Sequence, residues 1–193
     1  MKHISVTKTE WDIQYKNNKW DYLSTLEETS RYCVISGYIL QLDCKKILDL
    51  GCGCGLLYNY LYKNQLELYT GVDISNVAIM QSKNLNSKTV QFFEEDIAIF
   101  KPGESYDIII CNEVLYYLED PQYIISRYLN FLRKHGRILI SIYTPLDHKH
   151  FGYKIAVQLK EIVYAMDIII EENISIVNRT KKKRWEIILA KPK

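Results

Sequence analysis

Hydrophobic residues recur with two different periods along this chain. Between about residues 45 and 143, short apolar runs alternate with longer segments whose apolar residues follow a helical spacing. The apolar runs predict strands at 47–50, 68–73, 90–96, 106–111 and 137–143. The other segments predict helices at 27–40, 56–63, 76–85 and 121–134. Strands that alternate with helices predict an α/β fold with a doubly wound parallel sheet.

The last fifty or so residues follow a different order. An amphipathic segment at 153–165 predicts a helix, and two apolar stretches at 167–176 and 185–190 predict strands. A short polar connection between two strands favours an antiparallel hairpin over another crossover. We therefore expect one Rossmann-like domain over residues 1–193, with a seven-stranded, mostly parallel sheet that ends in a hairpin.

Composition narrows the picture only by exclusion. Apolar residues make up 48% and charged residues 25% of the 193 residues, as in ordinary globular proteins, and the net charge of +2 gives no argument for nucleic acid or a membrane as partner. There is no apolar run of membrane-spanning length, and residues 1–5 lead into a polar, aromatic stretch rather than a signal peptide. Five cysteines without a secretory signal favour a reducing, cytoplasmic location.

A glycine-rich turn, Gly51-Cys52-Gly53-Cys54-Gly55, follows the first predicted strand directly. Glycine adopts backbone conformations that other residues avoid and lets a ligand lie against the main chain. A helix that begins at Leu56 would add unpaired N–H groups. The turn therefore predicts a site for a nucleotide-like ligand. Since no histidine is near Cys52 and Cys54, we expect them to fill a tight turn and not to bind metal.

Glycine spacing and acidic residues indicate which nucleotide is bound. Asp73 follows the first glycine by about twenty residues, where a carboxylate can bind ribose hydroxyls. The dinucleotide pattern G-x-G-x-x-G would need glycine where Leu56 stands. A carboxylate at Asp49 would repel phosphate but suit a ligand with an ammonium and a sulfonium group. A cofactor without phosphates is favoured over NAD.

Four segments in register carry a family resemblance. Residues 47–55, 71–75, 95–97 and 106–118 resemble the first, second, third and strand-four motifs of class I S-adenosylmethionine-dependent methyltransferases. The resemblance covers residues 45–143. It implies that S-adenosylmethionine is the cofactor and S-adenosylhomocysteine the product.

The resemblance also implies a set of cofactor-binding residues. The turn would lie against the methionine part, Asp49 near its ammonium group and Asn112 beside the sulfonium. Asp73 would bind the ribose, Ile74 would pack on the adenine, Asp96 would accept from the adenine amino group and the Ile97 backbone would meet the ring. The cofactor-binding residues implied for residues 45–143 are Asp49, Gly51, Cys52, Gly53, Asp73, Ile74, Asp96, Ile97 and Asn112.

The methyl acceptor is less explicit. An oxygen acceptor needs a base, for which Glu113, Tyr116, His148 and His150 are candidates. Their alternative roles are a helix cap for Glu113, packing for Tyr116 and a surface loop for the histidines. No Asn/Asp-Pro-Pro-aromatic motif follows strand four, which argues against base nitrogens in nucleic acid as acceptor.

Residues 113–120 narrow the acceptor by resemblance, since they are similar to the nodulation N-methyltransferases, which act on an amino sugar. We therefore expect methyl transfer to an oxygen or nitrogen of a small molecule, such as a sugar or amino sugar. The basic run at 179–184 could touch phosphate, but a solvated hairpin tip is the favoured interpretation.

The aromatic N-terminal region is expected to cover the cofactor. Residues 8–32 would form a lid, from which Tyr15 and Arg31 reach the methionine carboxylate or the acceptor. In the alternative, Trp11 and Trp20 pack on the sheet. The domain then divides into an N-terminal helical lid segment (1–40), a cofactor-binding core (45–143), and a substrate-side helix with the C-terminal strand pair (144–193).

Two other functions stay open. A nicotinamide-dependent oxidoreductase shares the fold, although Leu56 and Asp49 speak against it. A module that binds S-adenosylmethionine without catalysis is also compatible, because no indispensable catalytic residue can be named. We expect no metal cofactor, and a monomer or homodimer.

Overall fold

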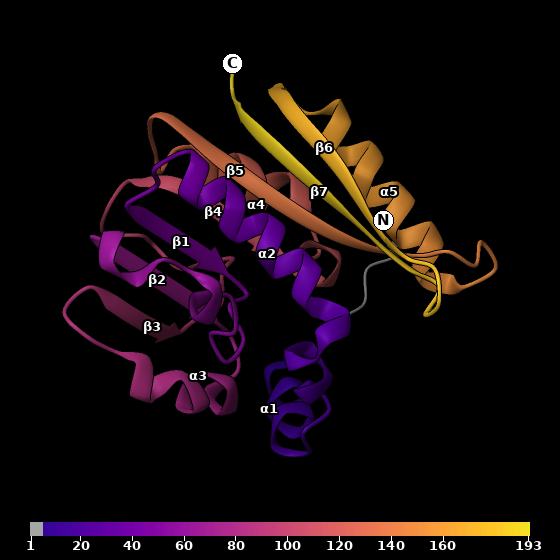
Figure 1. Ribbon diagram of the computed structural model, residues 1–193, viewed down its shortest axis with the longest axis horizontal. Helices are drawn as coiled ribbons and strands as arrows, with labels where there is room; N and C mark the ends of the chain where they lie inside the picture. The colour runs from indigo at the N-terminus through magenta and orange to yellow at the C-terminus, as the bar shows by residue number, and fades with distance from the viewer. Residues whose placement is uncertain (1–5) are drawn as a thin grey trace.

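Seven strands form a single sheet in the order β3-β2-β1-β4-β5-β7-β6 (Figure 1). The computed structural model describes residues 6–193. Residues 1–5, which begin the predicted lid segment and which we expect not to be part of a signal peptide, lie outside the described residues. The strands are β1 (Lys46–Leu50), β2 (Leu68–Asp73), β3 (Val90–Glu94), β4 (Tyr106–Asn112), β5 (Leu132–Pro145), β6 (Ile168–Asn178) and β7 (Lys183–Pro192).

Strands β1 to β5 pair in parallel, whereas β7 runs antiparallel between β5 and β6. The predicted Rossmann-like, mostly parallel sheet with a C-terminal antiparallel hairpin is confirmed. The α-helices are α1 (Lys8–Lys16), α2 (Leu26–Gln41), α3 (Asn76–Ser82), α4 (Pro121–Leu129) and α5 (Phe151–Ala165). The short 3₁₀-helices are η1 (Asp21–Ser24), η2 (Leu57–Tyr60), η3 (Lys63–Gln65), η4 (Lys83–Leu85) and η5 (Leu115–Tyr117).

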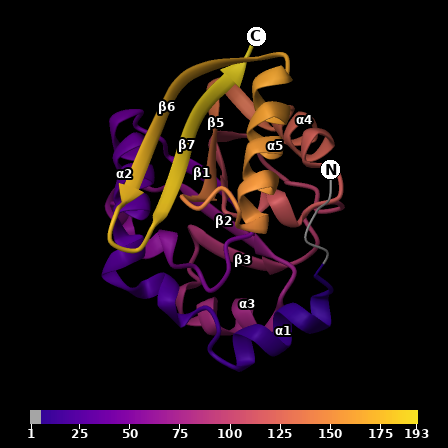
Figure 2. The same cartoon turned by 90° about the vertical axis from the view of Figure 1, so that its right-hand side faces the viewer.

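Two apolar layers cover the sheet, with α2 on one face and α4 and α5 on the other (Figure 2). In β4, Ile108 and Ile110 pack with α2, while Ile109 and Cys111 pack with α4 and α5. Successive side chains of a strand point to opposite faces, so a strand covered on both sides must be apolar throughout. Each fully buried isoleucine contributes about 1.5–3 kcal/mol.

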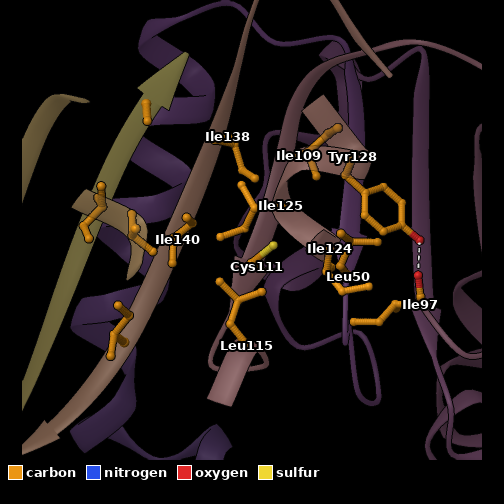
Figure 3. Close-up of a cluster of buried hydrophobic side chains, with 14 of the residues drawn as sticks. Leu50, Ile97, Ile109, Cys111, Leu115, Ile124, Ile125, Tyr128, Ile138 and Ile140 are labelled. Atoms are coloured by element: carbon orange, nitrogen blue, oxygen red, sulfur yellow. Dashed lines mark hydrogen bonds between the residues drawn. The ribbon is translucent and has the colours of Figure 1, made fainter. Parts of the chain in front are cut away.

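Two residues of α4 donate hydrogen bonds to the segment that follows β3. The Tyr128 hydroxyl donates to the Ile97 carbonyl at 2.7 Å (Figure 3). Arg127 donates to the same carbonyl at 3.0 Å. Helix α4 therefore holds the segment that follows β3 in place.

The helix predicted at 56–63 is wrong. The structure has only the 3₁₀ turns η2 and η3 there. Ser36 donates its hydroxyl to the Tyr60 carbonyl at 2.6 Å, and backbone bonds span three residues, such as Leu61 N–H to Tyr58 at 3.3 Å. Tyrosine and asparagine are also weaker helix formers than leucine or alanine. The helix N-terminus expected beside the glycine turn is therefore absent.

The boundary between α4 and β5 also differs from the prediction. Helix α4 ends at Leu129 instead of continuing to 134, and β5 begins at Leu132, before Gly136. The Tyr106 N–H donates to the Phe131 carbonyl at 2.8 Å, and Arg133 pairs with Asp107 at 3.0 Å. Contacts with β4 thus override the local helical pattern.

Helix α2 matches its predicted range to within one residue at each end, whereas α1 was anticipated only as part of a helical segment. A capping box starts α1: Glu10 N–H donates to the Thr7 hydroxyl, and the Glu10 carboxylate accepts from Thr7 N–H. The residues Thr7-Lys8-Thr9-Glu10 carry this signal in the sequence. Within residues 6–193, no helix combines the length and apolar character needed to cross a bilayer.

Candidate active site

A cavity of about 1560 Å³ opens at the carboxyl ends of the parallel strands. Its walls come from the glycine turn, the ends of β2, β4 and β5, the start of β7, and the segment from α1 to α2. Small-molecule pockets usually measure about 300–1,000 Å³. The cavity therefore has room for a cofactor and a second molecule beside it.

The glycine turn has the backbone that its sequence predicts. Gly51, Gly53 and Gly55 have φ angles of 71°, 55° and 77°. A Cβ at Gly51 would lie 2.5 Å from Cγ2 of Val114, and one at Gly53 would lie 2.7 Å from the Tyr15 hydroxyl. Only glycine fits at these positions, because both the conformation and the space exclude a side chain.

The turn does not form a phosphate cradle. Gly51 and Cys52 N–H both donate to the Val72 carbonyl, at 2.8 and 3.0 Å. Gly53 N–H donates to the Asp73 carboxylate at 2.8 Å. Because these three N–H groups are already bonded and no α-helix follows, they are not available as donors to a pyrophosphate.

Asp49 has an unsatisfied carboxylate oxygen beside the turn. The residue is 1% exposed, and its Oδ2 accepts from the Tyr69 hydroxyl at 2.6 Å. Its Oδ1 is buried with no hydrogen-bond partner. Burial raises the pKa of Asp49 to about 7. Since buried polar atoms are normally bonded, a cationic ligand in the cavity would complete this site.

Asp73 connects the end of β2 to the glycine turn. Its two oxygens accept from Ser75 N–H and Gly53 N–H, each at 2.8 Å. Burial raises the pKa of this carboxyl. Each carboxylate oxygen can accept a second hydrogen bond, so Asp73 can hold the turn and still bind ligand hydroxyls.

Three further predicted cofactor residues border the same cavity, namely Ile74, Asp96 and Ile97. Asp96 is half-buried, and its Oδ1 accepts from Ala98 N–H at 2.8 Å. Ile97 is buried, and its carbonyl is taken by Tyr128. Together with Asp73, these three residues give the cavity wall both apolar side chains and a carboxylate.

Arg31 and Asn112 meet at the cavity wall. Arg31 is 1% exposed, and its Nη1 donates to Asn112 Oδ1 at 2.5 Å. Its Nη2 donates to Glu28 Oε2 at 3.1 Å, while Nε has no partner. The guanidinium thus holds the Asn112 side chain at the end of β4, and both residues line the cavity.

Lys183 departs from the expected solvated hairpin tip. Its Nζ donates to Glu28 Oε1 at 3.0 Å and lies 5.3 Å from the Tyr22 ring centre. Lys181 pairs with Glu27 at 2.9 Å. The tip of the β6–β7 hairpin is therefore tied to the start of α2, and Lys183 borders the cavity.

Glu113 and Tyr116 come together on the wall of the cavity. Glu113 has a φ of 64°, a conformation that costs energy in a residue other than glycine. Its Oε1 accepts from the Ser141 hydroxyl. Its Oε2 accepts from Tyr143 N–H at 3.0 Å and from the Tyr116 hydroxyl at 2.8 Å. Burial and the Glu113 carboxylate raise the pKa of Tyr116. Glu113 does not cap the next helix.

The two loop histidines separate. His148 is exposed, stacks on Tyr153 at 4.4 Å and does not line the cavity. His150 does line it, and its Nδ1 accepts from Gly152 N–H at 3.1 Å at the start of α5. The structure therefore does not bring His148 to the other candidate residues.

Helix α1 lies across one side of the cavity. Asp12 accepts from the Ser75 hydroxyl at 2.7 Å, which joins α1 to the start of α3. Trp11 meets Tyr117 edge-on at 4.8 Å and Trp20 at 5.4 Å. Both tryptophans border the cavity and neither belongs to the sheet's two apolar clusters. The alternative in which they pack on the sheet is wrong.

Several cavity residues were not anticipated. They are Tyr22, Glu28, Tyr143, Lys183 and Trp185. Pairing of β5 with β7 sets Tyr143 opposite Trp185 and brings Lys183 to the end of β5. No local motif marks Tyr143, Lys183 or Trp185, because the antiparallel register that places these three residues is a long-range property of the fold.

Comparison with known proteins identifies the family. A family model described as a methyltransferase domain matches residues 21–184. The chain belongs to this family of methyltransferase domains. The ubiquinone biosynthesis O-methyltransferase of Coxiella burnetii is 34% identical over 106 residues, which are 53% of this chain and 45% of that protein. The chain spans about half the length of the curated relatives that it matches first.

Two solved structures share the fold. The N-methyltransferase NodS of Bradyrhizobium japonicum, solved with S-adenosylhomocysteine, has a TM-score of 0.71 and 16% identity, covering 95% of this chain and 99% of that one. The 1,6-didemethyltoxoflavin-N1-methyltransferase of Burkholderia thailandensis has a TM-score of 0.74 and 15% identity, covering 96% and 87%. At such identities the likeness shows the fold alone.

Proposed function

We propose that this protein transfers a methyl group from S-adenosylmethionine to an oxygen or nitrogen of a small molecule. The observation that carries the proposal is Asp49, a buried carboxylate with one unpartnered oxygen beside a glycine turn in which the N–H groups of Gly51, Cys52 and Gly53 are already bonded. This arrangement favours a cationic ligand without phosphates. Family membership supports the same conclusion over a nicotinamide-dependent oxidoreductase.

The residues present fit S-adenosylmethionine. Asp49 would pair with the ammonium group, and the buried Arg31 is available to the methionine carboxylate through its unpartnered Nε. Asp73 would accept from the ribose hydroxyls, while Asp96 and Ile97 would bind the adenine. When bound, the cofactor supplies an electrophilic methyl group on a positively charged sulfur.

The chain's own contribution to the reaction is positioning and exclusion of water. Methyl transfer is an in-line displacement, so alignment supplies much of the rate enhancement. Arg31 holds Asn112 at the end of β4, and Tyr15 lies over Gly53. We propose that residues 8–32 act as a lid over the donor. Deletion of residues 1–25 should weaken S-adenosylhomocysteine binding and turnover, and unchanged values for both would contradict the lid.

Glu113 and Tyr116 are proposed as the catalytic pair. The Tyr116 hydroxyl donates to Glu113 Oε2 and borders the cavity. A proton leaving an acceptor hydroxyl would pass to Tyr116 Oη while the tyrosine proton passes to Glu113 Oε2. An amine acceptor needs no base before transfer, only a later loss of its proton.

A sugar or amino sugar suits the part of the cavity beside Glu113 and Tyr116, which we call the acceptor half, as distinct from the donor half at the glycine turn, Asp49 and Asp73. Trp11, Trp20 and Tyr117 present adjoining ring faces and edges there. Aromatic faces attract cations and the apolar faces of rings.

A radiolabelled methyl donor offered with amino sugars, sugars and small amines tests the proposal. We expect label in at least one acceptor and tighter binding of S-adenosylhomocysteine than of NADH in a tryptophan-fluorescence titration. Binding of NADH alone would favour an oxidoreductase. Binding of S-adenosylhomocysteine with no labelled product from any acceptor would favour a non-catalytic module.

A further inference from the structure

Tyr69 is a core residue whose hydroxyl bonds to Asp49 at the glycine turn. It is fully buried in β2, between the rings of Tyr58 at 5.1 Å and Phe92 at 5.6 Å. Its hydroxyl donates to Asp49 Oδ2 at 2.6 Å. In the β1–β2 register Tyr69 lies opposite Ile47, so Asp49 is its diagonal neighbour on the same face of the sheet.

Packing alone does not require this hydroxyl. A phenylalanine would fill the same space between the neighbouring rings. A buried hydroxyl destabilises the folded chain unless it is bonded, and its one acceptor is a carboxylate that is itself buried. The Tyr69–Asp49 contact therefore serves the carboxylate more than the core.

We propose that Tyr69 is a positioning residue of the donor site. By holding Oδ2 of Asp49, it directs the unpartnered Oδ1 to the ammonium group of S-adenosylmethionine and keeps the carboxylate ionised. This inference rests on the proposed function, because it concerns the ligand assigned to the same cavity. It assigns a role to a residue that has no contact with the cavity of its own.

The surroundings of Asp49 make its charge sensitive to this one bond. Burial raises its pKa to about 7, the Tyr69 hydrogen bond lowers it, Asp73 raises it and Arg31 lowers it. The titratable and charged groups that face it come from β2, the glycine turn, β4 and α2, and are Tyr69, Asp73, Cys52, Cys111, Arg31 and Tyr32. Loss of the hydroxyl therefore favours the neutral acid, which cannot pair with an ammonium group.

The pH dependence of S-adenosylhomocysteine binding tests the proposal, because this ligand has the same ammonium group. Titration calorimetry on the full chain between about pH 6 and 8.5 should show wild-type affinity falling as the pH drops through about 7. Tyr69→Phe should move this fall to higher pH. At pH 7 its affinity should be about fivefold weaker, because a shift of about one pKa unit lowers the ionised fraction of Asp49 from about one half to about one tenth.

Tyr106→Phe is the matched control. It removes another buried tyrosine hydroxyl, which donates to Thr70 Oγ1 at 3.0 Å, also on β2. Its pH profile should equal that of the wild type even if its stability falls. An unchanged profile in Tyr69→Phe, or an equal shift in Tyr106→Phe, would overturn the inference and leave the proposed function intact.

Asp49→Asn tests the link from the other side of the bond and does not depend on the folding of the Tyr69 variant. We expect weak binding without the fall near pH 7, and no further loss when Tyr69→Phe is added. A wild-type pH profile in Asp49→Asn would overturn the inference. Failure of the wild type itself to bind at any pH would overturn the proposed function together with it.

Discussion

The donor half and the acceptor half of the cavity are built in different ways. In the donor half, the glycine turn is held by residues about twenty positions away, on the neighbouring strand: Gly53 N–H bonds to Asp73, and Tyr69 bonds to Asp49. In the acceptor half, Lys183 bonds to Glu28 across a sequence separation of 155 residues. Under the proposed function, donor recognition would follow from local motifs at the strand ends, while acceptor recognition would follow from side chains that only the folded sheet brings together.

The largest effect is expected at Gly53. Gly53→Val places a side chain against the Tyr15 hydroxyl at a φ of 55°, so S-adenosylhomocysteine binding should fall by more than about a hundredfold. Calorimetry measures the loss. Gly37→Ala is the control, because no atom lies within 4 Å of its added Cβ, and it should bind normally with slightly higher stability. Normal binding by Gly53→Val would show that the turn does not contact the donor.

Asp49 should lower stability at neutral pH. The pKa of Asp49 is raised to about 7 in the folded chain, whereas an aspartate in the unfolded chain has a pKa near 4. Between about pH 4 and 7 the folded chain therefore keeps a proton that the unfolded chain has released. The free energy of unfolding falls as the pH rises through this range. Asp49→Asn should lack this fall and be more stable above pH 7 by about 2–4 kcal/mol. Urea unfolding at several pH values measures the difference. A constant difference from pH 4 to 8 would contradict the raised pKa.

Glu113→Gln should slow turnover by about a hundredfold without changing S-adenosylhomocysteine affinity. The carboxamide cannot take the proton from Tyr116. Initial rates with a labelled donor measure the effect, and Tyr116→Phe should lose a similar amount with no additional loss in the double variant. Glu161→Gln, an exposed residue of α5 that does not line the cavity, is the control. Equal rates in Glu113→Gln and Glu161→Gln would remove Glu113 from the catalytic pair.

Lys183→Met should give the smallest effect and separate the two halves. We expect the acceptor KM to rise about tenfold, equivalent to about 1.4 kcal/mol, with donor affinity unchanged. Steady-state kinetics with each substrate varied in turn measures the change. Arg179→Met removes a charge from the exposed end of the same hairpin and should leave both constants unchanged. A selective loss of donor affinity in Lys183→Met would contradict the assignment of Lys183 to the acceptor half of the cavity.

The candidate site was predictable from sequence where one local segment carries the information. Residues 51–54 of the glycine turn line the cavity together with Asp49 and Asp73, and the sequence could group them because strand ends and glycine spacing are local properties. His148 was not, because the sequence of a loop does not say which of its side chains turns inward: His150 borders the cavity and His148 stacks on Tyr153.

By itself the sequence determined the alternation of strands and helices, the antiparallel hairpin and the choice of a cofactor without phosphates. Only the tertiary structure decided that residues 57–60 form a 3₁₀ turn and that the Tyr69 hydroxyl donates to Asp49. It also decided that Lys183 bonds to Glu28 at the cavity and is not part of a solvated hairpin tip. The physical reason is distance along the chain. Periodicity and turn chemistry act over a few residues, whereas these contacts depend on which strands become neighbours and in which register.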